Sequence, residues 1–165
     1  MTVVKINFEE GKLTEHGKKH VARAMFEKGK SFVRASAYLR KENGYEFVIL
    51  HLLCQGMEIT LKSFLLFGNY DKYKSQLKQI GHNLEKLAEV CSQEYGIAVG
   101  RKELLSELTI LNSLYADHIL RYGYGSVQDI LVDPKTIRSG WVGWRLAASI
   151  RLANYLLGIS PEKQA

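Results

Sequence analysis

The stretch 45–68, YEFVILHLLCQGMEITLKSFLLFG, constrains the fold of this chain more than any other. Apolar residues recur in it at alternating steps of three and four, which is the spacing of one face of a helix. Further apolar residues fall outside that face, and a helix that is apolar nearly all round must be surrounded by other elements. His51, Gln55, Glu58 and Lys62 interrupt the stretch, so it is expected to be a core helix rather than a membrane span.

Other segments also have helical spacing. Thr14 is a suitable N-cap for a helix over 14–40, and Asn83 for a helix that ends before Gly96. Further helices are expected over 101–122 and about 141–158, with a partly helical connection over 69–80 and an irregular stretch over 123–140. The sequence predicts an all-α, up-and-down helical bundle of four to five helices, with an N-terminal arm (1–13), a bundle domain (14–158) and a C-terminal tail (159–165).

Composition narrows the classes of function. A chain of 165 residues is one domain by size, and its two cysteines, Cys54 and Cys91, lie in apolar helical patterns typical of buried free thiols. The N-terminal residues lack the pattern of a signal peptide, so a cytoplasmic protein is expected. The net charge of +6 is concentrated in 12–41. That basic segment is either a solvated face or a surface that meets phosphate.

A polar stripe runs along the expected core helix. His51, Gln55, Glu58 and Lys62 step by four, three and four, so they share one helix face. Glu58 and Lys62 have the spacing and order of a favourable ion pair. The stripe either fixes the register of the bundle or lines a ligand pocket in which Glu58 and His51 form hydrogen bonds or transfer protons.

The stretch 111–126, LNSLYADHILRYGYGS, holds the main candidates for catalysis. On one continuous helix His118 and Arg121 would share a face, and Arg121 could bind a phosphate as a guanidinium fork. Tyr122 or Tyr124 could stack on a base. Alternatively, Arg121 only stabilises the C-terminus of a helix, where a cation is favourable. His82 is likewise either a loop-packing residue or a contact to the ligand.

The sequence gives no support for a metal or a cofactor. His16 and His20 are four residues apart, as in many zinc sites, but no third ligand is evident. The glycines of GYGS are not followed by the lysine of a phosphate-binding P-loop, and no strand is expected before them. We therefore predict no metal and no cofactor.

Three segments together resemble the HEPN domain (higher eukaryotes and prokaryotes nucleotide-binding). The pattern H-x-x-x-Q-x-x-E-x-x-x-K-x-x-L fits the stretch from His51 to Leu65, and G-H-[DN]-L-x-x-L fits Gly81 to Leu87. An Arg-Tyr pair, Arg121 and Tyr122, then ends a helix, as in that family. The resemblance covers about residues 14–155.

The resemblance implies a helical bundle that commonly forms a homodimer. Many HEPN proteins are metal-independent endoribonucleases of toxin–antitoxin or defence systems, with an Arg-x(4–6)-His motif at the active site. Here no histidine follows Arg121 at that spacing, and other HEPN branches without the motif are thought to bind nucleotides, RNA or proteins. The sequence therefore favours an accessory protein that binds a nucleotide, RNA or an antitoxin-like partner near Arg121, His82 and the basic first helix. The alternatives are a ribonuclease toxin with a degenerate site at Arg121 and His118, or a purely structural dimer.

Overall fold

The computed structural model describes residues 13–96 and 102–122, which are almost entirely helical. No strand occurs in these two ranges, so the predicted all-α class is confirmed. Most of the expected arm, the stretch 123–140, the helix 141–158 and the tail 159–165 lie outside the described residues. The described helices are α1 (Glu15–Lys41), α2 (Glu46–Gly68), α3 (Tyr70–Ile80), α4 (Leu84–Tyr95), α5 (Lys102–Tyr115) and α6 (Ile119–Tyr122).

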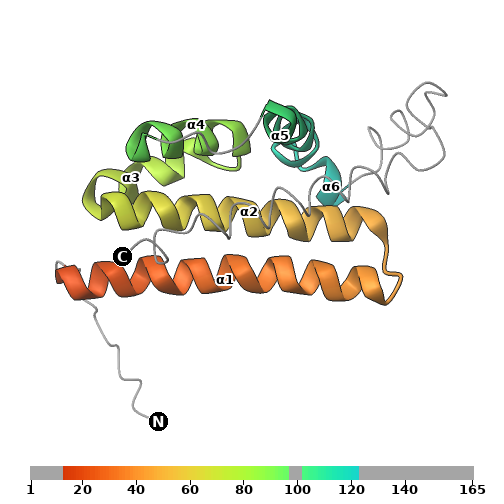
Figure 1. Ribbon diagram of the computed structural model, residues 1–165, viewed down its shortest axis with the longest axis horizontal. Helices are drawn as coiled ribbons and strands as arrows, with labels where there is room; N and C mark the ends of the chain where they lie inside the picture. Colours follow the sequence, from red (N-terminus) through yellow and green to blue (C-terminus); the bar gives the residue numbers. More distant parts are fainter. Residues whose placement is uncertain (1–12, 97–101, 123–165) are drawn as a thin grey trace, which may run out of the picture.

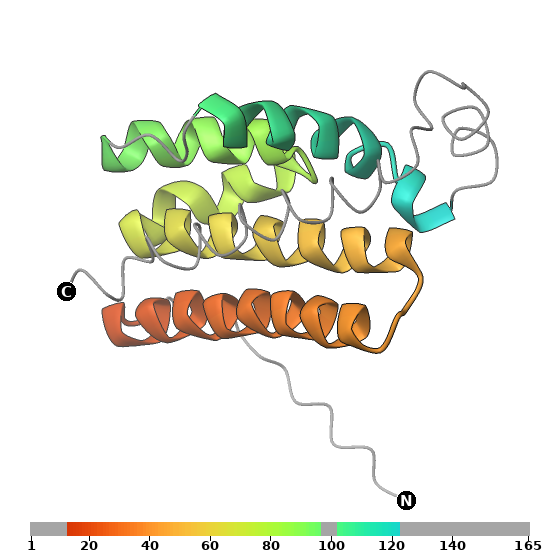
Figure 2. The same ribbon diagram turned by 45° about the vertical axis from the view of Figure 1, so that its right-hand side comes forward.

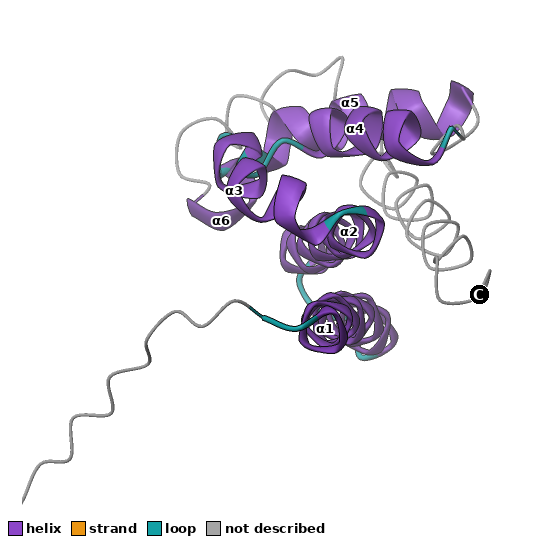
Figure 3. Cartoon of the chain, turned by 90° about the vertical axis from the view of Figure 1, so that its left-hand side faces the viewer, coloured by secondary structure: helices purple, strands orange, loops and turns teal. Residues whose placement is uncertain are grey.

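Helix α2 is the centre of the described part. Fourteen of its 23 residues are buried, as expected for a helix that is apolar nearly all round. Figures 1 and 2 show α1 antiparallel to α2 on one side, with α3, α4, α5 and α6 on the other. Seen along α2 in Figure 3, α4 and α5 run across it. Although α2 is long and apolar enough to cross a membrane, 67% of its most apolar stretch is buried inside the molecule, as in a core helix.

Helices α1 and α2 approach most closely at two glycines. A Cβ atom added to Gly29 would lie 2.6 Å from Oγ1 of Thr60 and 3.0 Å from the carbonyl oxygen of Gly56. One added to Gly56 would lie 2.7 Å from a methyl carbon of Val33. The two backbones therefore meet where neither helix has a side chain.

The predicted helix ends are largely confirmed. The hydroxyl of Thr14 accepts a hydrogen bond from the Gly17 amide (3.1 Å), which caps α1. Asn83 caps α4 by accepting from the Lys86 amide (2.8 Å), and Gly96 after that helix has the left-handed conformation.

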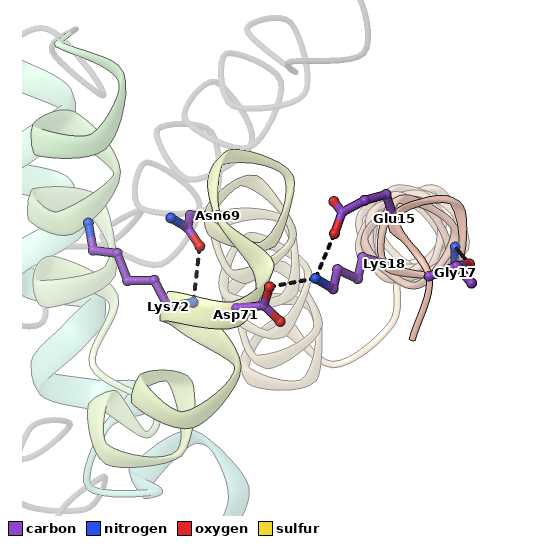
Figure 4. Close-up of polar contacts among 7 residues, drawn as sticks. Glu15, Gly17, Lys18, Asn69, Asp71 and Lys72 are labelled. Carbon is purple, nitrogen blue, oxygen red and sulfur yellow. Dashed lines mark hydrogen bonds and ion pairs between the residues drawn. The ribbon is translucent and has the colours of Figure 1, made fainter. Parts of the chain in front are cut away.

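Helix α3 is more regular than the partly helical connection that the sequence suggested. Asn69 caps it by accepting from the Lys72 amide (3.0 Å), and only Tyr73 and Ile80 are buried. Its first turn is tied to α1, because Lys18 forms an ion pair with Asp71 while also contacting Glu15 (Figure 4). This ion pair is exposed, so it contributes little to stability.

Candidate functional site

Glu58 on α2 is a buried carboxylate that three side chains surround. Its Oε1 accepts from Nζ of Lys62 (2.5 Å), as the helical spacing predicted. Its Oε2 accepts from the hydroxyl of Tyr115 (2.6 Å) and lies 3.0 Å from Nδ1 of His82. Only 5% of Glu58 is exposed. A charge that is buried this deeply needs such partners, because it has lost its hydration.

The protonation states within this cluster follow from its contacts. Burial acts to raise the pKa of the Glu58 carboxyl, but hydrogen bonds from Lys62, Tyr115 and His82 outweigh it, so the pKa lies below its usual value. Burial and the hydrogen bond to Glu58 both raise the pKa of Tyr115. At neutral pH the cluster therefore contains an ionised carboxylate and a neutral tyrosine that donates to it.

Next to Glu58 lies a cavity of about 170 Å³. Its walls come from α2, the α3–α4 turn, α5 and the segment that follows α5, so residues far apart in the sequence meet there. The lining residues are His51, Gln55, Glu58, Ile59, His82, Tyr115, His118 and Arg121.

Aromatic rings form much of the wall. The His82 ring makes edge contacts with Tyr115 (centroids 6.0 Å apart) and His118 (5.2 Å), and the His51 ring lies 5.7 Å from Tyr115. Burial lowers the pKa of His51, and the charges of Arg121 and His118 lower it further. His51 is therefore neutral at neutral pH, and its buried Nδ1 has no hydrogen-bond partner in the described part of the chain.

His118 and Arg121 reach the cavity by a route that the sequence did not predict. The expected helix 101–122 is broken: α5 ends at Tyr115 and α6 begins at Ile119. Between them His118 has φ 60°, the left-handed conformation that few non-glycine residues adopt. In an unbroken helix Tyr115 and Arg121 would point roughly 120° apart. The break allows the side chains of Tyr115 and Arg121 to line one cavity. The shared helix face predicted for His118 and Arg121 was therefore wrong, although both residues line the same cavity.

The N-terminus of α4 is closed to an anion. The Leu84 amide donates to Oδ1 of the buried Asn112 (2.7 Å), and Asn83 occupies the Lys86 amide. Nδ2 of Asn112 also donates to Glu85 (3.1 Å), which adds a carboxylate to the same helix end. A phosphate in the cavity would thus be bound by side chains rather than by these amides.

The candidate residues from the sequence mostly converge. His51, Glu58, His82, His118 and Arg121 line the cavity, whereas Lys62 acts behind it through Glu58. Tyr122 belongs to α6, and Tyr124 lies outside the described residues.

The basic first helix is not part of this cavity. Helix α1 supplies none of the lining residues and lies on the far side of α2 (Figures 1 and 3). Some of its charge is also compensated locally, because Lys30 pairs with Glu27 and Lys18 with Glu15. The single groove that we expected to combine Arg121, His82 and the basic helix is therefore absent from the described structure.

Sequence reasoning missed the polar role of Tyr115. Its ring is buried, but its hydroxyl binds Glu58, 57 positions away. The only available signal was general: a buried tyrosine usually has a hydrogen-bond partner.

Within 13–96 and 102–122, no group of three or more His, Cys, Asp or Glu side chains is arranged to hold a metal ion. His16 and His20 do not belong to such a group, and Cys54 and Cys91 form no disulfide.

In comparisons with known proteins, the chain matches no protein-family model, no curated protein and no solved structure.

Proposed function

We propose that this protein binds a phosphate-bearing ligand, a nucleotide or RNA, in the cavity beside Glu58, and that it acts by binding rather than by catalysis. One observation carries the proposal: Arg121 lines a small cavity together with the imidazoles of His51, His82 and His118. A guanidinium has only donors, in a fork that matches phosphate oxygens.

The negative charge of Glu58 does not oppose this proposal. Lys62 balances it, and Tyr115 and His82 also occupy its oxygens. What the cavity offers an incoming anion is therefore the Arg121 cation and rings that can stack or form hydrogen bonds. The resemblance to HEPN domains without the Arg-x(4–6)-His motif is consistent with this assignment.

The test is a binding assay of the purified protein on a labelled RNA pool with EDTA present. Arg121→Ala is compared with Arg40→Ala, which removes an exposed arginine of α1 far from the cavity lining. We expect wild-type affinity to fall steeply with salt. Arg121→Ala should weaken binding and reduce the slope of log K against log salt by about 0.7. Equal binding by wild type and Arg121→Ala would contradict the proposal.

A second candidate function, metal-independent RNA cleavage, has an observation of its own. The Glu58 carboxylate holds Nδ1 of His82, which is how a carboxylate orients a histidine base in many hydrolytic sites. His118 adds a second imidazole next to His82. Cleavage products that form in EDTA and disappear in Arg121→Ala would favour this candidate over binding alone.

The proposed partners follow from the same resemblance. A homodimer and an antitoxin-like protein partner are both properties of HEPN systems, and a structural dimer needs no ligand. Light scattering during size exclusion measures the oligomeric state. A dimer that binds no RNA would favour the structural alternative.

A further inference from the structure

The hydrogen bond between His82 and Glu58 decides which nitrogen of His82 faces a ligand as an acceptor. Nδ1 of His82 is 3.0 Å from Oε2 of Glu58. An ionised carboxylate only accepts hydrogen bonds, so Nδ1 must carry the proton and donate it. In the neutral ring the lone pair is then on Nε2.

The orientation of this ring is fixed from several sides. Tyr115 donates to the same carboxylate oxygen and meets the His82 ring edge-on at 6.0 Å. His118 meets it at 5.2 Å, also edge-on. Since 49% of the His82 side chain is exposed while Glu58 is buried, the ring has one end anchored and the other accessible to a ligand.

The cavity therefore makes two different demands on a ligand. Arg121 can donate to an acceptor such as a phosphate oxygen, and Nε2 of His82 can accept from a donor such as a hydroxyl group. The cavity volume of about 170 Å³ is below the roughly 300–1,000 Å³ of pockets that enclose a whole drug-sized ligand. It suits a fragment in which a phosphate and a hydroxyl are close neighbours.

We infer that Nε2 of His82 accepts a hydrogen bond from the ribose 2′-hydroxyl beside a phosphate that Arg121 holds, so that the site selects ribonucleotides over deoxyribonucleotides. The 2′-hydroxyl is the group that distinguishes RNA from DNA at such a site. The inference rests on the proposed function, because it assumes that the cavity binds a phosphate-bearing ligand, and it makes His82 a specificity-determining residue.

Three labelled probes distinguish the effect of the 2′-hydroxyl from that of the rest of the sugar. They are a ten-nucleotide oligouridylate, its 2′-fluoro analogue and its deoxy analogue. The 2′-fluoro probe keeps a ribose-like sugar pucker but has no hydroxyl to donate. Anisotropy titrations of the full chain in EDTA give the affinities, and gels check that the RNA probe stays intact. We expect wild type to bind the RNA probe about three- to tenfold more tightly than the 2′-fluoro probe, which is the value of one net hydrogen bond.

Two substitutions of His82 should reduce this preference to different extents. The asparagine of His82→Asn can still donate to Glu58 but has no acceptor where Nε2 was, so the ratio of the two affinities should fall to about one. The longer amide of His82→Gln carries an oxygen near the Nε2 position, so it should keep part of the preference. His20→Asn on exposed α1 is the matched control and should behave like wild type.

The outcomes separate this inference from the function on which it rests. Equal binding of the RNA and 2′-fluoro probes by wild type, with both weakened by Arg121→Ala, overturns the inference and leaves the proposed function standing. A preference that survives in His82→Asn also overturns the inference. If wild type binds none of the three probes, the proposed function fails and the inference fails with it. Circular dichroism checks that each variant is folded, and His82→Gln provides the comparison if His82→Asn is not.

Discussion

The hydroxyl of Tyr115 donates a 2.6 Å hydrogen bond to Oε2 of Glu58, which joins two residues that are 57 positions apart and 5% exposed each. This contact links α5 to the central helix α2 inside the core. It also connects the stability of the helical fold to the site, because the same carboxylate orients His82.

Removing this hydrogen bond should cost stability in a way that depends on both partners. Tyr115→Phe leaves Glu58 with Lys62 and His82, and we expect it to lower the free energy of unfolding by about 1.5–3 kcal/mol, the range for hydrogen bonds to charged groups. Urea unfolding of Tyr115→Phe, Glu58→Gln and the double variant gives a coupling energy. We expect at least about 0.5 kcal/mol. Strict additivity would show that the two side chains do not stabilise each other.

The contact between α1 and α2 should reject even a methyl group. Gly29→Ala would bring a Cβ within 3.0 Å of backbone atoms of Gly56 and Thr60, which cannot move without separating the helices. We expect a loss of about 1–3 kcal/mol in the free energy of unfolding.

Gly17→Ala is the control for that substitution. It is in the same helix, but its Cβ would have only ordinary contacts from 3.4 Å outward. There alanine should stabilise the protein by up to about 1 kcal/mol, because it favours the helical conformation. Denaturant midpoints of the two variants should therefore move in opposite directions, and equal shifts would contradict the close approach at Gly29.

The partly buried His51 should make the protein less stable in mild acid. Its pKa in the folded state lies below the ordinary 6.5, so below that pH the unfolded chain binds a proton that the folded chain resists. The free energy of unfolding should therefore fall between pH 7.5 and 5.5. In His51→Phe this fall should be smaller, whereas the exposed control His20→Asn should keep the wild-type slope. Denaturant titrations at the two pH values measure it.

Both cysteines should be inert while the protein is folded. Cys54 is fully buried, and burial raises the pKa of the Cys91 thiol to about 12, so almost no thiolate forms at pH 8. Ellman's reagent should detect much less than one thiol in the native protein and two after denaturation. Rapid reaction of native protein would contradict the described packing of α2 and α4.

The helices that have clear end signals could be predicted from sequence. Thr14, Asn83 and Gly96 mark ends that the structure confirms, because capping depends on local hydrogen bonds. Helix α3 was underestimated because it buries only Tyr73 and Ile80, which is too few for a recognisable apolar face.

The break after α5 had no local signal. No glycine or proline occurs between Tyr115 and Ile119, and the helical spacing continues through His118 to Tyr122. Tertiary contacts, rather than local propensity, therefore select the left-handed residue. The same limit applies to the site: spacing put His51, Glu58 and Lys62 on one face. The pairing of Glu58 with Tyr115 and His82 appears only when α5 and the α3–α4 turn pack against α2.

The left-handed backbone at His118 divides the site into two parts. Glu58 and Tyr115 belong to α2 and α5, and His82 to the α3–α4 turn, whereas the cation of Arg121 belongs to the one-turn α6 beyond His118. Because Leu120 belongs to the buried core and Ile119 packs against it, a protein engineer could replace Arg121 alone and change the charge presented to a ligand. The hydrogen bonds that fix the His82 ring would stay intact, so ligand preference could be redesigned without rebuilding the core.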